Sequence, residues 1–184
     1  MVKELFFALW FFLPAGLANM APILVAKAAG KTWDAPIDGG LTYRGRRVFG
    51  NHKTWRGLVS GMVAATLTLW LQQLAVLHNH TLAQWTDQMY YPDIATFIVG
   101  PLFGFGVLAG DAIESFFKRQ RNVAPGHSWF PFDQIDYVIG TIIAVSPFVQ
   151  LHFWQYVVLL VFGLLGSLIS SYIGFLTGFK ERPI

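Results

Sequence analysis

The chain has 184 residues, of which 54% are hydrophobic and only 12% are charged, and its formal net charge is +3. Soluble domains carry about twice that share of charged residues, so the composition excludes an ordinary soluble protein and predicts one embedded in a bilayer. The absence of cysteine excludes disulfides and thiolate-bound metals. At roughly 20 residues per spanning helix, the length suits one membrane domain, residues 1–184.

The first predicted span covers about Leu5–Ala26. Its apolar run is longer than that of a signal peptide and lacks a small-residue cleavage site, so we expect a retained helix. Pro14 and Pro22 interrupt the backbone hydrogen bonds of this helix. Asn19 is polar at membrane depth and should face the protein interior, where it either bonds a neighbouring helix or contacts substrate.

A long polar segment follows, here called loop one (residues 27–56). Its weak periodicity and many turn formers predict a loop with short helical pieces. The run from Gly45 to Thr54 approaches the spacing of a Walker phosphate loop, but Asn51 and His52 intrude and no strand precedes it, which excludes that motif. The glycines and cations still suit phosphate groups; alternatively, the cations contact anionic lipid headgroups.

Four further spans complete an all-α integral membrane protein of about five transmembrane helices. We place them at about Gly57–Leu77, Ile94–Phe117, Asp133–Gln150 and Phe153–Phe179, with a loop between the first two of these. The span at Asp133–Gln150 is short for a full crossing. Small residues in the span at Ile94–Phe117 should allow close helix packing, namely Gly100, Gly104, Gly106 and Gly110.

The basic residues predict the orientation. With five spans, all Lys and Arg residues except Lys3 fall on one side of the membrane, in loop one, in a second loop (residues 118–132) and at the C-terminal end. The positive-inside rule then places the N-terminus outside and the C-terminus in the cytoplasm. Both polar loops, and any site they form, should therefore lie on the cytoplasmic face of the cell membrane.

The stretch Gly110–Asp136 concentrates acidic groups between two apolar segments, which is costly in a membrane unless it serves a function. Asp111, Glu114, Ser115 and Lys118 share one helix face. Asp133 and Asp136 are three residues apart at the start of the next span. Two helix ends should thus point carboxylates into one pocket, and Mg²⁺ prefers such ligands together with substrate phosphates.

Simpler roles remain open for several of these residues. Asp133 follows Pro131 and could cap its helix, with Asp136 completing the capping pattern. Glu114 could pair with Lys118 one turn later. Asp111 has no such alternative because it lies inside a helix.

Three separated motifs resemble those of the CTP:phosphatidate cytidylyltransferases, or CDP-diacylglycerol synthases. The run from Asp111 to Arg119 is similar to the family's GDxxESxxKR, and it is followed by Pro125-Gly126-His127 and then by the pair Asp133 and Asp136. The segment KTWRG, beginning at Lys53, is similar to KTWEG. Asp38-Gly39-Gly40, ahead of Gly45-Arg46, is similar to the upstream DxGAYxxGR.

The chain also departs from the general pattern of that family. It is short, and PGHSW stands where PGHGG is usual. This compact form, with LPAGLANMAPIL in the first span and PIDGG in loop one, resembles the archaeal branch, the CDP-archaeol synthases. That resemblance implies transfer of CMP from CTP to an isoprenoid glycerol ether phosphate, with release of pyrophosphate.

On this basis we expect Mg²⁺ as cofactor, and CTP, the ether lipid phosphate and membrane lipid as partners. No nucleic-acid partner is expected, and a homodimer is allowed. The expected catalytic residues are Asp111, Asp133, Asp136 and Lys53, of which the three aspartates hold the metal. The expected CTP-binding residues are Asp38, Gly39, Arg46, Lys53, Thr54, Lys118 and Arg119. The expected contacts of the lipid phosphate are Lys118, Arg119 and His127.

Two other functions fit parts of the pattern. A phosphatidate cytidylyltransferase would use the same residues on a diacyl lipid. A small membrane transporter would use the carboxylates as an ion path, but the charged residues cluster at one end of the predicted spans rather than at midplane.

Overall fold

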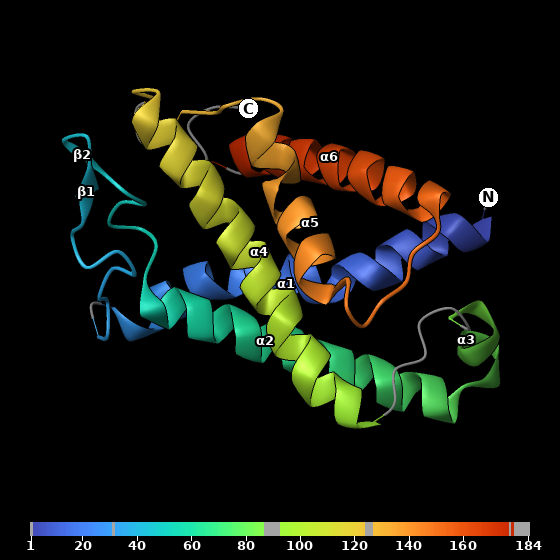
Figure 1. Ribbon diagram of the computed structural model, residues 1–184. Coiled ribbons are helices and arrows are strands. Elements are labelled where there is room, and N and C mark those ends of the chain that lie inside the picture. The colour runs from blue at the N-terminus through green and yellow to red at the C-terminus, as the bar shows by residue number, and fades with distance from the viewer. Residues whose placement is uncertain (1, 31, 87–92, 124–126, 177, 179–184) are drawn as a thin grey trace.

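The computed structural model describes residues 2–30, 32–86, 93–123, 127–176 and 178. The described chain is mostly helical (Figure 1), and a short two-stranded hairpin is formed by β1 (Thr42–Tyr43) and β2 (Arg46–Arg47). The helices, in chain order, are α1 (Val2–Ala29), α2 (Trp55–His78), α3 (His80–Trp85), α4 (Asp93–Gln120), α5 (Phe132–Val145) and α6 (Phe153–Leu176).

Four helices of the described chain are long and apolar enough to cross a membrane: α1, α2, α4 and α6. The remaining predicted span corresponds to α5, which has 14 residues. At 1.5 Å per residue this helix is about 21 Å long, less than the roughly 30 Å hydrocarbon core. The chain is thus a multi-pass membrane protein, and the count of five crossings stays a prediction.

Helix α4 lies between α2 and α5, and its glycines permit both contacts. A Cβ added to Gly104 would lie 2.4 Å from the Cα of Met62 on α2. A Cβ added to Gly106 would lie 2.6 Å from the carbonyl oxygen of Gly140 on α5. Any side chain at these positions would force the backbones apart, so the predicted close packing through small residues is confirmed.

The apolar core lies where α1 meets the other long helices. Phe11 of α1 is fully buried, and its ring centroid lies 5.1 Å from that of Phe103 on α4. Phe12 contacts the rings of Tyr137 on α5 and Phe162 on α6. Aromatic packing of this kind fixes α1 against three helices, while its other face carries exposed leucines that suit lipid contact.

Two details of the predicted secondary structure were wrong. Between α1 and α2, the described residues of loop one form a hairpin rather than short helices, because Arg44 and Gly45 adopt positive φ values of 53° and 75° and reverse the chain tightly. The loop predicted after α2 contains α3, whose first turn is capped by the side chain of Asn79, which accepts from the Leu82 N–H.

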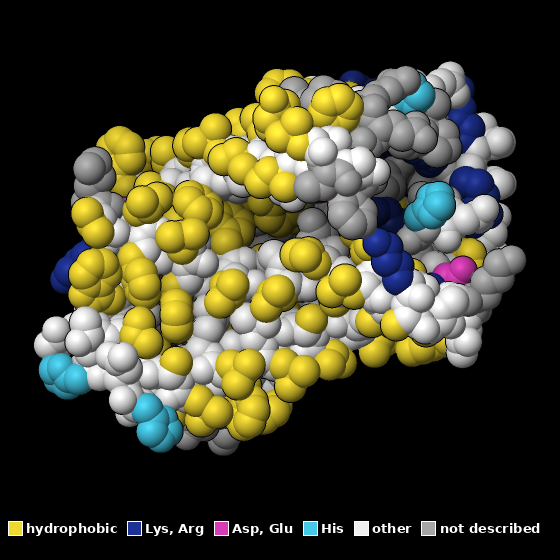
Figure 2. All heavy atoms as spheres, turned by 180° about the vertical axis from the view of Figure 1, so that it is seen from behind, with side chains coloured by type: hydrophobic (Ala, Val, Ile, Leu, Met, Phe, Trp, Pro, Cys, Tyr) yellow, Lys and Arg dark blue, Asp and Glu magenta, His cyan; other side chains and the backbone are white. Residues whose placement is uncertain are grey.

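Charged groups gather at one end of the molecule. Loop one, the C-terminal end of α4 and the C-terminal end of α6 share this end, whereas the N-terminus and α3 lie at the opposite end (Figure 1). Figure 2 shows Lys and Arg side chains concentrated at the same end and hydrophobic side chains covering the body between the two.

Candidate active site

A pocket of about 430 Å³ opens at the charged end. Five parts of the chain contribute to it: α1, loop one, α4, α5 and α6. Its charged lining residues come in equal numbers of each sign, with carboxylates on α4 and α5 and cations on loop one and α4. The charged residues that line it are Asp111, Glu114, Asp133, Asp136, Arg47, Lys53, Lys118 and Arg119.

Three carboxylates meet at the floor of this pocket. Asp111 and Glu114 of α4 and Asp136 of α5 each offer an oxygen, and these oxygens all lie within 4.8 Å of one another. Gly110 explains the approach, since a Cβ there would lie only 2.3 Å from the carbonyl oxygen of Asp136. Because glycine has no Cβ, α5 can approach α4 at this point and bring Asp136 beside the two carboxylates of α4.

Lys118 lies beside this cluster and joins it to Asp133. Its Nζ is 3.0 Å from Oε1 of Glu114 and 3.4 Å from Oδ2 of Asp133. The pairing of Glu114 with Lys118, which the sequence left open as an alternative, is therefore present. Because Glu114 is 6% exposed, this ion pair is largely shielded from solvent, and the lysine offsets part of the cost of burying the carboxylate.

The capping alternative for Asp133 and Asp136 is wrong. The cap position of α5 is Pro131, and no side chain caps this helix. Asp133 accepts instead from the backbone N–H of Trp129 at 3.1 Å, and Asp136 from that of Tyr137 at 2.6 Å. Both carboxylates line the pocket.

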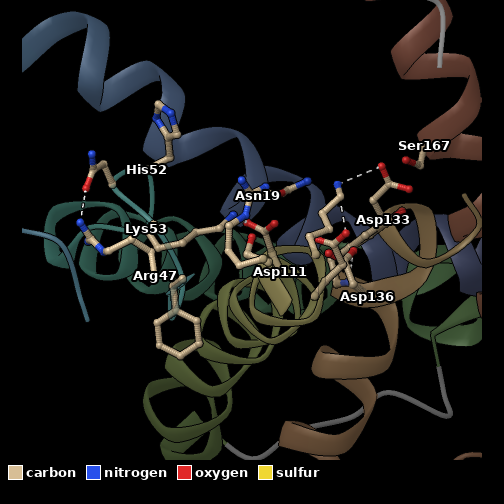
Figure 3. A pocket seen from close by; sticks show the side chains of 16 residues that line it. Asn19, Arg47, His52, Lys53, Asp111, Asp133, Asp136 and Ser167 are labelled. Carbon is tan, nitrogen blue, oxygen red and sulfur yellow. Dashed lines mark hydrogen bonds and ion pairs between the residues drawn. The ribbon is translucent and has the colours of Figure 1, made fainter. Parts of the chain in front are cut away.

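Lys53 enters from the opposite side. Its Nζ contacts Oδ2 of Asp111, so loop one reaches the carboxylates of α4. Figure 3 shows Arg47 and Lys53 on the side of loop one, Asp111 between, and Asp133 and Asp136 on the far side. Residues separated by about half the chain therefore share one pocket.

Asp38 lies elsewhere, and it is not among the described residues that line the pocket. Its side chain is 1% exposed and pairs with Arg47 at 2.6 Å. Burial alone would raise the pKa of this carboxyl, but hydrogen bonds from Arg47 and from the N–H groups of Phe49, Gly50 and Gly40 outweigh it and hold the pKa well below its usual range. Asp38 is thus a charged carboxylate inside loop one.

The other predicted binding residues divide into two groups. Lys118 and Arg119 line the pocket with Lys53. Four others do not line it in the part of the chain that the structure describes: Gly39, Arg46, Thr54 and His127. Pro125 and Gly126, which precede His127 in the family-like motif, lie outside the described residues.

Three of those four make other contacts. Arg46 donates to the carbonyl oxygen of Gln120 at the end of α4, which docks the hairpin there. Thr54 caps α2, accepting from the Gly57 N–H at 3.1 Å. Gly39 donates its N–H to the carbonyl oxygen of Pro36 at 3.1 Å, which closes the turn between these two residues.

Several pocket residues were absent from the predicted set. Glu114 shares a helix face with Asp111, a spacing that could have placed it with the metal ligands. Asn19 lines the pocket from α1, and its polarity at membrane depth could have indicated that it belongs to the site. Ser167 of α6 also lines it, and no pattern in the sequence points to that residue.

This arrangement suits polyphosphate chemistry. The clustered carboxylates could bind a metal ion, since hard divalent cations prefer oxygen ligands. The cations around them supply donors for phosphate oxygens. Since both sets converge on one pocket at the end of a membrane bundle, a water-soluble phosphate compound and a lipid headgroup could meet there.

Comparisons with known proteins agree with this chemistry. A sequence model of the CarS-like CDP-archaeol synthases matches residues 1–184. The chain is 33% identical over 183 residues to CDP-archaeol synthase of Thermococcus onnurineus (strain NA1), covering 99% of this chain and 98% of that one. It is 34% identical over 184 residues to CDP-archaeol synthase of Methanosarcina barkeri (strain Fusaro / DSM 804), covering 93% and 99%.

A solved structure is also similar, that of an intramembrane enzyme for archaeal membrane lipids biosynthesis. The two folds superimpose with a TM-score of 0.66 at 25% sequence identity. The match covers 89% of this chain and 91% of the other.

Proposed function

The chain belongs to the CDP-archaeol synthase family, and we propose that its pocket is where CTP reacts with an archaeal ether lipid phosphate. Membership makes it a CTP-dependent cytidylyltransferase of archaeal membrane lipid biosynthesis. One observation carries the assignment of the site: Asp111, Glu114 and Asp136 converge on a pocket that also holds Lys53 and Lys118.

The reaction joins the lipid phosphate to the CMP part of CTP. An oxygen of the lipid phosphate attacks the α-phosphorus of CTP, the bond to the β-phosphate oxygen breaks, and pyrophosphate leaves. The protein must align attacking and leaving oxygens and balance the negative charge around them. We assign Lys53 and Arg47 to the triphosphate, and Lys118 and Arg119 to the two phosphate groups where they meet.

We assign the metal site to the carboxylate cluster, with Mg²⁺ as the ion. Three clustered oxygen donors of Asp111, Glu114 and Asp136 fit a hard divalent cation. Asp133, which the sequence also places in this set, lies beside the cluster and shares Lys118 with Glu114. When bound, the ion would neutralise phosphate charge and polarise phosphoryl oxygens.

We further propose that the charged end faces the cytoplasm, where CTP is available. Except for Lys3, the described Lys and Arg residues lie in loop one, at the adjoining end of α1, at the end of α4 and just beyond α4. This distribution supports the proposal through the positive-inside rule. The isoprenoid chains would then lie along the apolar helices, and Asn19 on α1 would contact the polar headgroup, because its side chain lines the pocket.

The test is a CTP turnover assay with detergent-solubilised protein. Radiolabelled CTP is incubated with Mg²⁺ and either the unsaturated archaeal ether lipid phosphate or phosphatidic acid. We expect release of pyrophosphate and labelled CDP-lipid with the ether lipid, and much less with the diacyl lipid. Faster turnover of phosphatidic acid would support the diacyl alternative, and no CTP turnover with either lipid would contradict the proposed function.

A further inference from the structure

Asp38 is the most thoroughly bonded carboxylate in the described chain, although it is not among the described residues that line the pocket. It lies in loop one with 4% of its surface exposed. A buried charge of this kind is costly unless it is paired and hydrogen-bonded. Its partners therefore indicate what the residue is for.

Those partners belong to the segment that leads to Lys53. Oδ2 of Asp38 accepts from the N–H groups of Phe49 at 3.0 Å and Gly50 at 3.1 Å. Oδ1 accepts from the guanidinium of Arg47 at 2.6 Å, and from the N–H of Gly40 at 3.1 Å. Four residues between Gly40 and Gly50 are thus bonded to one carboxylate.

Backbone pairing carries this order to Lys53 itself. The N–H of Ile37, the residue before Asp38, donates to the carbonyl oxygen of Lys53 at 2.8 Å. The N–H of Trp55 donates to the carbonyl oxygen of Ala35 at 3.0 Å. These two bonds flank Thr54, so the backbone directly after the Lys53 Cα is paired with residues 35–37, which lead into Asp38. The Nζ of Lys53 reaches Asp111 from that support.

The Asp38 carboxylate also orients Arg47, a second cation of loop one besides Lys53. Arg47 lines the pocket, and besides Asp38 its guanidinium donates to Oδ1 of Asn51 at 2.7 Å. An acceptor-only side chain is required at position 38 because every group aimed at it is a donor. Asparagine would place its own NH₂ group against some of those donors.

We propose that Asp38 is a positioning residue, which sets Lys53 and Arg47 for the triphosphate of CTP without touching the nucleotide. This inference rests on the proposed function, and it gives Asp38 a different role from the CTP contact expected from sequence. It predicts that loss of the carboxylate weakens CTP binding and leaves the lipid phosphate and the metal unaffected.

The first experiment compares Asp38→Asn with Asp34→Asn in the CTP turnover assay. Asp34 is the matched control because it lies in the same loop and pairs with Arg56 at 3.1 Å, but is 46% exposed. We expect Asp38→Asn to raise KM for CTP about tenfold, the loss of one charge-assisted contact, with kcat and the KM for lipid changed less than about threefold. Asp34→Asn should leave all three near wild type.

A mutant cycle separates positioning from direct contact. In a background that carries both Lys53→Ala and Arg47→Ala, Asp38→Asn should raise KM for CTP by about threefold or less, because its effect acts through the two missing cations. A full tenfold rise in that background would mean that Asp38 contacts CTP itself, and would overturn the proposal. So would a lower melting temperature with unchanged KM in the single variant, which is the result of a purely structural role.

A glycine pair tests the same support if Asp38→Asn folds poorly. Gly40 has φ of 91° and donates to Asp38, whereas Gly45 has φ of 75° and turns the hairpin. A Cβ at either position meets no atom within 4 Å, so both alanine variants carry a similar backbone penalty without a clash. We expect Gly40→Ala to raise KM for CTP several-fold more than Gly45→Ala; equal values would overturn the proposal.

Failure of this inference is distinguishable from failure of the proposed function. If the wild-type chain does not turn over CTP, the proposed function fails. If the wild type is active and both Asp38→Asn and Gly40→Ala keep the wild-type KM for CTP, the proposed function is supported and the positioning role of Asp38 is contradicted.

Discussion

The two sides of the pocket are held in place by different forces. The carboxylate side is a seam between α4 and α5, where Gly110 brings the backbones into direct contact. The cationic side is loop one, whose hydrogen bonds to Asp38 arrange Arg47 and Lys53. One side depends on steric fit between helices, and the other on a single buried charge.

The difference follows from what each side must hold. Like-charged carboxylates within 4.8 Å repel one another, so only a rigid frame keeps Asp111, Glu114 and Asp136 together. Cations that bind a polyphosphate are attracted to their ligand, so the protein needs only to orient them toward it. A loop tied by hydrogen bonds, each contributing about 1 kcal/mol, is sufficient for that.

The largest expected effect is on the carboxylate side. Asp111→Asn and Asp136→Asn should each lower CTP turnover about 1000-fold, since a metal ion contributes several kcal/mol of transition-state stabilisation. The melting temperature in detergent should stay near wild type, because relief of repulsion within the cluster offsets the loss of contacts such as the ion pair between Lys53 and Asp111. Wild-type activity in Asp136→Asn would remove that residue from the metal site.

The members of the metal site can be separated by a second pair of variants. Glu114 belongs to the cluster of three, whereas Asp133 lies beyond Lys118. We expect Glu114→Gln to raise the Mg²⁺ concentration for half-maximal activity more than Asp133→Asn does. The opposite order would favour the ligand set expected from sequence.

The next effect tests the seam itself. Gly110→Ala places a Cβ 2.3 Å from the Asp136 carbonyl oxygen, so α5 must shift by about 1 Å, which can lower activity about 100-fold. Overpacking should also destabilise the protein by about 1–3 kcal/mol. Gly166→Ala on α6 is the control, because a Cβ there meets nothing within 4 Å. Normal turnover in Gly110→Ala would show that the seam does not set the carboxylate geometry.

A smaller and more selective effect is expected on the cationic side. Lys53→Ala should raise KM for CTP about 30-fold through loss of a charge-assisted contact, and leave the Mg²⁺ requirement nearly unchanged. Titrations of CTP and of Mg²⁺ on the same preparation measure both. An unchanged KM would point to a role for Lys53 in topology or lipid contact.

The smallest effect concerns Thr54, next to Lys53. Its hydroxyl caps α2, so Thr54→Ala should lower stability by about 1 kcal/mol and leave KM for CTP unchanged. Thermal unfolding in detergent and CTP kinetics distinguish the two properties. Thr54→Ser, which keeps the hydroxyl, should behave as wild type, whereas a raised KM in Thr54→Ala would restore the predicted contact with CTP.

Much of the fold was predictable because apolar runs determine membrane helices locally. The predicted spans at Leu5–Ala26, Gly57–Leu77 and Ile94–Phe117 coincide with α1, α2 and α4 to within three residues at every end. The hairpin in loop one was missed because its strands have two residues each and carry no periodic pattern. Helix α3 was missed for the same reason, being six residues long.

The carboxylates were predictable as a group because residues three apart on a helix share a face, which placed Asp111 with Glu114 and Asp133 with Asp136. Which of the four come together depends on the contact between Gly110 and α5, a contact between residues distant in the chain.

The membrane environment, the helices, the family and the residue types of the site could all be inferred before folding, because they follow from local composition and motif spacing. The folded chain was needed to show that Glu114 joins Asp111 and Asp136, and that Asp38 turns inward to hold the loop that carries Lys53. Hydrogen bonds and close backbone contacts depend on three-dimensional proximity. A one-dimensional pattern shows a carboxylate but not the donors that surround it.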